Sequence, residues 1–190
     1  MDPERERELV TRLRQGEHAA FDAVYDAYRA KVFGFLARMA GRRELAEDLV
    51  QETFLRLAAR ATQLTEDTRL AAWLFTVARN LYWSHCRSAL LDAARLDALA
   101  VAPPPGSMPS PFESAAASQM GARLERAFAT LTERDREVLL LVAVERLDHA
   151  DAAAVLELSP EALRQRLSRA RTRLEAALTE HASRATQRSS

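Results

Sequence analysis

The stretch from Ala100 to Gln119 decides how this chain can fold, because it holds five of the seven prolines among 190 residues. It reads AVAPPPGSMPSPFESAAASQ. Proline fixes the backbone φ angle and lacks an N–H donor, so a helix cannot continue through this stretch. A proline-rich chain is extended and semi-rigid. We therefore predict a flexible linker over residues 100–119, two domains over residues 1–99 and 120–180, and a disordered tail over residues 181–190.

Both flanking segments are predicted to be helical. The chain has only five glycines, which leaves little material for the turns of a sheet protein. Upstream of the linker, apolar residues recur at helical spacing, with a break at Gly41. The helices predicted there are Glu4–Arg14, Phe21–Met39, Glu44–Ala59 and Thr68–Leu91. The expected fold class is all-α, with two small helical domains.

The second half has the outline of a helix-turn-helix. Thr132 is expected to cap a helix whose apolar run continues to Val144, and a short helix over Asp148–Leu156 follows. A longer helix then begins, with Ser159 at the N-cap and Pro160 at the first helical position. A short helix, a tight turn and a longer helix are typical of a DNA-binding unit.

The longer helix carries arginine opposite its apolar stripe. The stripe is Leu163, Leu167, Ala170 and Leu174. Five arginines fall within ten residues on the remaining surface. Arginine bonds guanine edges or phosphates and glutamine reads adenine, so this surface predicts DNA binding, although a solvated face or a partner-binding helix would show the same pattern. The predicted DNA-binding residues are Ser159, Arg164, Gln165, Ser168, Arg169, Arg171 and Thr172.

Two upstream surfaces are candidates for binding partners. On the helix Glu44–Ala59, an acidic side opposite the apolar residues is either a protein-docking surface or a solvated one. On the helix Thr68–Leu91, aromatic rings are interleaved with arginine, which is typical of surfaces that bind single-stranded nucleic acid. The core of that helix is predicted to be Leu70, Trp73, Leu74, Val77 and Leu81, and its outer side Phe75, Arg79, Tyr82, Trp83 and Cys86. Core packing is the alternative for these rings, and we favour it for Phe75.

Residues that could carry chemistry are sparse. The single cysteine, Cys86, excludes an internal disulfide. His85 stands beside it, but no second pair of cysteine or histidine residues stands at the spacing of metal ligands. The sequence has no Ser/His/Asp arrangement, glycine-rich phosphate-binding loop or pair of carboxylates more specific than a random sequence would contain. We therefore predict no catalytic residue, cofactor or metal. The N-terminus is too charged for a signal peptide. The longest apolar run, Leu70–Ala78, is far shorter than the ~18–20 residues of a membrane span. We therefore predict a cytoplasmic protein without membrane insertion.

Four segments resemble one protein family. AEDLVQETFLRL (46–57) and AAWLFTVARNLYWSHCR (71–87) resemble domain 2 of the extracytoplasmic-function sigma factors of bacterial RNA polymerase. LTERDREVLLL (131–141) and LDHADAAAVLELSPEALRQRLSRARTRL (147–174) resemble domain 4 of the same factors. The segments occur in the order of the family, with a linker between the two domains.

The resemblance implies a sigma factor, not an enzyme, that binds core RNA polymerase at the β′ clamp and the β flap. Such a factor directs transcription initiation by recognising the −10 and −35 elements of promoter DNA, and an anti-sigma factor is an implied partner. The implied core-polymerase-binding residues are Asp48, Gln51, Glu52, Phe54 and Leu55. The implied −10 residues are Arg79, Asn80, Tyr82, Trp83 and Arg87, with the stretch after Gln63. Residues 160–173 would read the −35 element.

The sequence departs from the family pattern at two turns. Arg146 and Glu157 stand where the family often has glycine, and Ala152 stands where a larger aliphatic residue is common. A left-handed residue other than glycine costs ~1 kcal/mol, which predicts a distorted turn or weaker DNA binding. Two alternatives stay open: a helix-turn-helix regulator of duplex DNA, and a helical interaction protein that mimics a sigma factor. The balance of 27 basic and 27 acidic residues favours the second.

Overall fold

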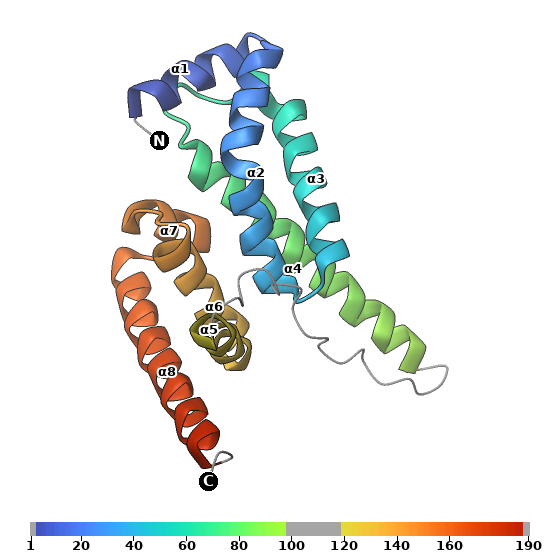
Figure 1. Ribbon diagram of the computed structural model, residues 1–190. Coiled ribbons are helices and arrows are strands. Elements are labelled where there is room, and N and C mark those ends of the chain that lie inside the picture. Colours follow the sequence, from blue (N-terminus) through green and yellow to red (C-terminus); the bar gives the residue numbers. More distant parts are fainter. Residues whose placement is uncertain (1–2, 98–118, 188–190) are drawn as a thin grey trace. The chain divides into compact units, whose positions relative to one another are not determined.

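The computed structural model describes residues 3–97 and 119–187, and every regular element there is a helix (Figure 1). The predicted all-α fold is confirmed. The chain divides into two compact units, residues 1–109 and 110–190. The predicted linker lies outside the described residues, apart from Gln119. In residues 3–97 and 119–187, no helix combines the length and the apolar character needed to cross a bilayer.

The first unit is a bundle of three long helices crossed by a shorter one. Its helices are α1 (Pro3–Arg14), α2 (His18–Ala40), α3 (Arg43–Arg60), a 3₁₀ turn η1 (Ala61–Gln63) and α4 (Leu70–Asp97). α2 packs against both α3 and α4. α1 lies across one end of this bundle, beside the loop that leads into α4 (Figure 1). All four predicted helices are confirmed, with ends that differ by a few residues.

Gly41 ends α2 at the predicted break. Its backbone is left-handed, with φ 64° and ψ 5°, and its N–H donates to the carbonyl oxygen of Ala37 at 3.0 Å. Glycine reaches this conformation without the steric cost that a Cβ atom brings. The chain therefore reverses from α2 into α3 within a short connection.

The core of the first unit lies between α2 and α4, with α3 on its side. Phe35 of α2 meets Phe75 of α4 edge to face, with ring centroids 5.5 Å apart, and both rings are buried. Tyr82 is also buried, so the rings of Phe75 and Tyr82 belong to the core and not to the outer side of α4. The predicted core side of α4 is therefore partly wrong, because Trp73 and Val77 are only half-buried. Since α4 packs against both α2 and α3, its buried arc is wider than the one-sided stripe assumed from sequence.

The second unit is built around a long C-terminal helix. Its described helices are α5 (Gln119–Thr130), α6 (Glu133–Leu139), the π-helical turn η2 (Leu140–Val144), α7 (His149–Leu156) and α8 (Pro160–Gln187). α8 packs against α5, α6 and α7. It continues to Gln187, beyond Glu180, where the predicted tail begins, and the predicted disorder of that tail stays a prediction. Alanine, arginine and glutamine favour a helix there, and neither glycine nor proline interrupts it.

Side-chain caps fix where the helices of the second unit begin. The hydroxyl of Thr132 accepts from the N–H of Asp135 at 3.2 Å, at the start of α6. The hydroxyl of Ser159 accepts from the N–H of Ala162 at 3.2 Å, at the start of α8. Both caps were predicted. Each satisfies an N–H that has no partner within its own helix, so the turn before α8 has a defined end.

Candidate functional site

One side of α3 carries acidic side chains and an exposed leucine. Asp48, Gln51, Glu52 and Leu55 recur at spacings of three or four residues and define what we term the α3 face. Leu55 is 64% exposed, and Arg56 holds Glu52 through a contact of 2.9 Å between Nε and Oε1. The predicted outward orientation of these four side chains is confirmed. Their role in binding stays a prediction.

Phe54 does not lie on the α3 face. It is 3% exposed, and its ring packs edge to face on Tyr25 of α2, with centroids 4.8 Å apart. The expected outward orientation of Phe54 is therefore wrong, and its role in core binding stays a prediction. A groove of about 440 Å³ between α2 and α3 runs beside it, lined among others by Phe33, Arg43 and Gln51. Sequence reasoning missed this groove because two helices build it together.

The outer side of α4 combines one aromatic ring with polar and basic side chains. Asn80, Trp83 and Arg87 recur at spacings of three or four residues and define the α4 face. Asn80 and Arg87 are exposed, and Trp83 is half-buried with its ring 5.5 Å from that of Tyr82. Arg79 lies at the edge of this face and donates to Asn80 Oδ1 at 3.4 Å. The structure thus brings four of the predicted −10 residues together and places Tyr82 beneath them.

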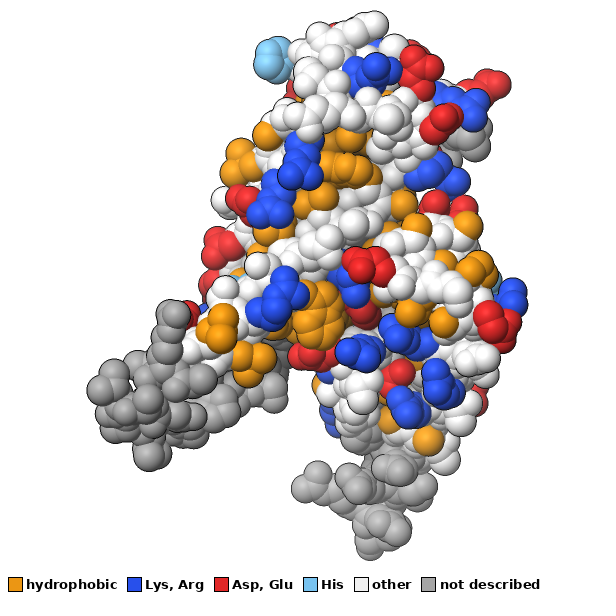
Figure 2. All heavy atoms as spheres, turned by 180° about the vertical axis from the view of Figure 1, so that it is seen from behind, with side chains coloured by type: hydrophobic (Ala, Val, Ile, Leu, Met, Phe, Trp, Pro, Cys, Tyr) orange, Lys and Arg blue, Asp and Glu red, His pale blue; other side chains and the backbone are white. Residues whose placement is uncertain are grey.

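α8 presents polar and basic side chains opposite a buried stripe. Leu163 and Ala170 are fully buried and Leu167 is 4% exposed, which confirms the predicted stripe at these three positions, whereas Leu174 is only half-buried. The exposed side chains opposite it define the α8 face: Arg164, Gln165, Ser168, Arg169, Arg171 and Thr172. Ser159 is exposed just before the helix. On the side of the molecule drawn in Figure 2, basic side chains gather over the second unit.

A carboxylate, Glu161, lies at the start of the α8 face. Its Oε2 pairs with the guanidinium group of Arg164, and its Oε1 accepts from Nε2 of Gln165 at 3.1 Å. The hydrogen bond from Arg164 lowers the pKa of Glu161, and the bond from Gln165 adds to the same effect. The carboxylate is therefore ionised at neutral pH and orients two of the side chains predicted to contact DNA.

Arg173 is exposed but is engaged in an ion pair within the second unit, so we do not count it in the α8 face. Its guanidinium group pairs with Asp135 of α6, which is 4% exposed. The same carboxylate accepts a hydrogen bond from the hydroxyl of Thr132 at 2.8 Å. This arginine therefore joins α8 to the start of α6. No local pattern predicts this bond, because its two residues stand 38 positions apart.

The turn between α7 and α8 keeps its geometry although its left-handed position holds Glu157. The residue has φ 56° and ψ 43°. Its N–H donates to Ala154 at 3.2 Å, and the N–H of Leu158 donates to Ala153 at 2.9 Å, which are the two hydrogen bonds of a Schellman motif. The left-handed conformation expected for Glu157 is confirmed, and Arg146 is left-handed too, with φ 57°. The expected distortion of the turn is wrong, because the motif is complete.

Comparisons with known proteins cover both units. Residues 24–90 match the family model of Sigma-70 region 2, and residues 121–174 match that of Sigma-70, region 4. The chain is 31% identical over 171 residues to the RNA polymerase sigma factor CarQ of Myxococcus xanthus, covering 90% of this chain and 96% of CarQ. It is 33% identical over 166 residues to the ECF RNA polymerase sigma factor BldN of Streptomyces coelicolor, covering 82% of this chain and 59% of BldN.

The chain belongs to the extracytoplasmic-function family of sigma factors. A solved structure of the sigma factor RpoE with the anti-sigma factor NepR, from Bartonella quintana, has a TM-score of 0.67 to it at 26% identity. The match covers 84% of this chain and 96% of RpoE. This sigma factor is a transcription initiation factor that directs polymerase to promoters, as the sequence predicted.

The three faces defined above fall inside the matched regions of this sigma factor. The region 2 match includes the α3 and α4 faces, and the region 4 match includes the α8 face. An ordinary helix-turn-helix regulator is not favoured, because it would have no region 2. A mimic without DNA binding is not favoured either, since the turn that Glu157 was expected to distort keeps both hydrogen bonds.

Proposed function

We propose that each of the three faces makes a different contact during promoter-specific initiation. The α3 face binds the β′ clamp of core polymerase, the α4 face opens and reads the −10 element, and the α8 face reads the −35 element. The observation that carries this proposal is the construction of α8, which follows a tight turn and is buried on one side and exposed, basic and polar on the other. A helix built in this way fits the major groove of duplex DNA.

The α8 face offers two kinds of contact to DNA. Arg164 and Gln165 are oriented by Glu161 and suit base edges, because arginine forms two hydrogen bonds with guanine and glutamine forms two with adenine. Arg169 and Arg171 make no ion pair with any residue in the described part of the chain. They are therefore available for phosphates or bases further along the groove.

The α4 face suits a single strand. The half-buried ring of Trp83 provides a surface on which a base can stack, and Arg87 and Arg79 are placed to approach the backbone phosphates. Asn80 can donate and accept hydrogen bonds at a base edge. Tyr82 supports the ring of Trp83 from the core side and does not contact the strand in this proposal.

In vitro transcription with purified core polymerase and a promoter that carries both elements tests the proposal as a whole. Replacement of Asp48 and Glu52 by arginine is expected to abolish binding to core polymerase, because both carboxylates lie on the α3 face. The matched control reverses two charges on α1, at Glu4 and Glu8, and is expected to bind normally. Helical content measured by circular dichroism should be the same in both variants. Normal core binding by the α3 variant would contradict the docking assignment.

The α8 face is tested by Arg164→Ala and Arg169→Ala, with Arg173→Ala as the control arginine of the same helix. Loss of a base contact costs about 1–3 kcal/mol and relaxes specificity at one position, whereas loss of a phosphate contact weakens all sequences alike and lowers the salt slope by about one. Footprints over the −35 region and binding at several salt concentrations separate these cases. If neither variant differs from Arg173→Ala, the α8 face does not read the −35 element.

We also propose that an anti-sigma protein controls this factor inside the cell. The support is the fold that it shares with RpoE, which was solved in complex with NepR. Purification of the tagged chain from its own cells, followed by addition of each co-purifying protein to the transcription reaction, tests this point. A protein that binds the chain and stops initiation in a dose-dependent way is expected.

A further inference from the structure

The helix α4 begins without a capping side chain of its own. The carbonyl oxygen of Arg69 accepts from the N–H of Trp73 at 2.9 Å, so Arg69 occupies the N-cap position and Leu70 is the first helical residue. The first N–H groups of a helix need acceptors from outside, usually a side chain at the N-cap. Arginine carries only donors and cannot supply one. The acceptor for the first turn of α4 must come from elsewhere in the chain.

Glu6 of α1 supplies this acceptor across 64 positions of sequence. Its Oε1 accepts from the N–H of Leu70 at 2.8 Å, and its Oε2 lies 3.6 Å from Nε of Arg69. Glu6 is 8% exposed, which is rare for a glutamate without a dedicated partner. A negative charge at this end of a helix also interacts favourably with the helix dipole. One carboxylate therefore bonds both the last residue of the loop and the first residue of α4.

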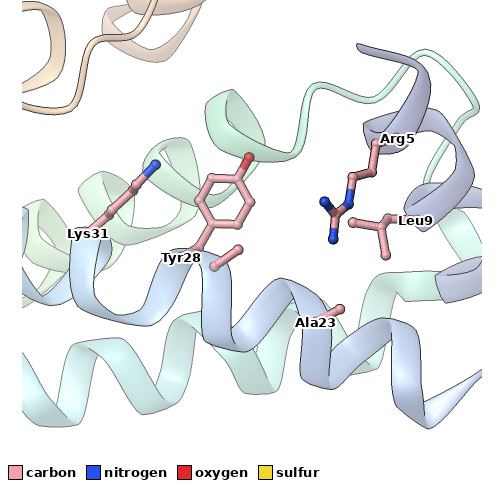
Figure 3. A pocket seen from close by; sticks show the side chains of 6 residues that line it. Arg5, Leu9, Ala23, Tyr28 and Lys31 are labelled. Carbon is pink, nitrogen blue, oxygen red and sulfur yellow. The ribbon is translucent and has the colours of Figure 1, made fainter. Parts of the chain in front are cut away.

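α1 is placed for this contact by its apolar side. Leu9, Val10 and Leu13 are buried against the bundle. Figure 3 shows Arg5 and Leu9 of α1 facing Tyr28 of α2 across a groove. The groove separates part of α1 from α2 close to Glu6. The hydrogen bond from Leu70 to Glu6 therefore holds this end of α1 where apolar contacts with α2 are fewer.

The loop that Glu6 closes has its own internal hydrogen bonds. Thr68 Oγ1 accepts from the N–H of Thr65 at 2.9 Å, and the N–H of Thr68 donates to the carbonyl oxygen of Thr65 at 3.0 Å. Its tip is held by α1 as well, through a contact of 3.3 Å between Arg14 and Glu66. The loop is therefore a closed turn that α1 holds at its tip and at its junction with α4. Without Glu6, the turn can stay intact while its attachment to α4 changes.

We infer that Glu6 is a positioning residue for promoter opening: it sets the orientation of residues 64–69 relative to α4, so that the loop and the α4 face contact the −10 element together. This inference rests on the proposed function, which assigns that element to α4, and on the −10 role that the family resemblance implies for the stretch after Gln63. Glu6 itself touches no DNA. Its effect is expected on the reading and opening of the −10 element, and not on core binding or on the −35 element.

Three variants of the full chain test the inference together with core polymerase. Glu6→Ala removes the acceptor and is expected to lower open-complex formation about tenfold. Its preference among single −10 base changes should become weaker. Glu6→Gln keeps an oxygen that can accept from Leu70 and should stay within about twofold of the wild type. Glu8→Ala removes a carboxylate from the exposed side of the same helix and should change nothing.

A fourth variant separates positioning from general loss of stability. Val24→Ala removes buried methyl groups from α2, far along the chain from the loop, and is expected to lower the unfolding temperature of the first unit. At a temperature where both variants are folded, only Glu6→Ala should lose −10 base preference. Binding of all variants to core polymerase and to a −35 duplex should equal that of the wild type.

The possible outcomes separate this inference from the proposed function. A wild-type chain that fails to initiate with core polymerase overturns the proposed function and this inference with it. A wild-type chain that initiates, while Glu6→Ala initiates equally well with the same −10 preference, overturns the inference alone. Equal loss of −10 preference in Val24→Ala and Glu6→Ala also overturns it, because general stability would then explain the effect.

Discussion

Replacement of Glu157 by glycine should stabilise the second unit without changing any side-chain contact of its core. Glu157 is exposed and left-handed, with φ 56° and ψ 43°. The left-handed conformation costs a residue with a Cβ atom about 1–2 kcal/mol. Glycine loses about 0.4–1 kcal/mol more backbone entropy on folding, which offsets part of the gain. From the middle of these two ranges the net stabilisation is about 0.8 kcal/mol, or a rise in unfolding temperature of about 3–6 °C for a domain of this size.

The distribution of tryptophan makes this measurable in the full chain. Both tryptophans, Trp73 and Trp83, lie in α4, so fluorescence reports on the first unit, while circular dichroism at helical wavelengths reports on both units. Glu157→Gly should raise the melting temperature of the second unit, seen by circular dichroism, and leave the melting temperature of the first unit, seen by fluorescence, unchanged. Glu157→Ala is the matched control, because it removes the same charge and keeps the Cβ atom. A glycine variant that melts no higher than the alanine variant would refute the reasoning.

Two further substitutions test the packing of α8. Leu163→Ala removes a fully buried side chain and should destabilise the second unit by about 2–5 kcal/mol, measured by urea denaturation; a cost below 1 kcal/mol would mean that this stripe is not core. Arg173→Ala removes the ion-pair partner of the buried Asp135 carboxylate, which keeps its hydrogen bond from the Thr132 hydroxyl, and should cost about 1–3 kcal/mol, less in high salt. Its base preference in DNA binding should stay that of the wild type, and a change there would place Arg173 among the reading residues.

The elements of this fold could be predicted because their signals are local. Periodic apolar residues located α1 to α4, and the hydroxyls of Thr132 and Ser159 marked helix starts that the structure has in the same places. The predicted stripe of α8 is correct at Leu163, Leu167 and Ala170 because the helix is buried on one side only. In each case the residues that decide the outcome stand within a few positions of one another.

The errors arose where two neighbours share one helix. Tyr82 and Phe54 were expected to face a partner, yet both are buried, because α4 and α3 each pack on more than one element. A helical wheel assigns one inward direction and cannot anticipate a second. The bond from Glu6 to Leu70 was missed for a related reason, since no local pattern tells which buried carboxylate caps a helix 64 positions away.

The contacts of Glu161 have a consequence for how α8 selects DNA. In the free protein this carboxylate already accepts hydrogen bonds from one guanidinium nitrogen of Arg164 and from Nε2 of Gln165, so DNA competes with it for these two donor groups. A base that accepts both sets of hydrogen bonds can replace the carboxylate, whereas a mismatched base leaves an ionised glutamate facing the negative duplex. Discrimination depends on the difference between these two outcomes and not on affinity alone. If the α8 face reads DNA as proposed, the carboxylate acts as an internal competitor that lowers binding to every sequence and lowers it most for the wrong ones.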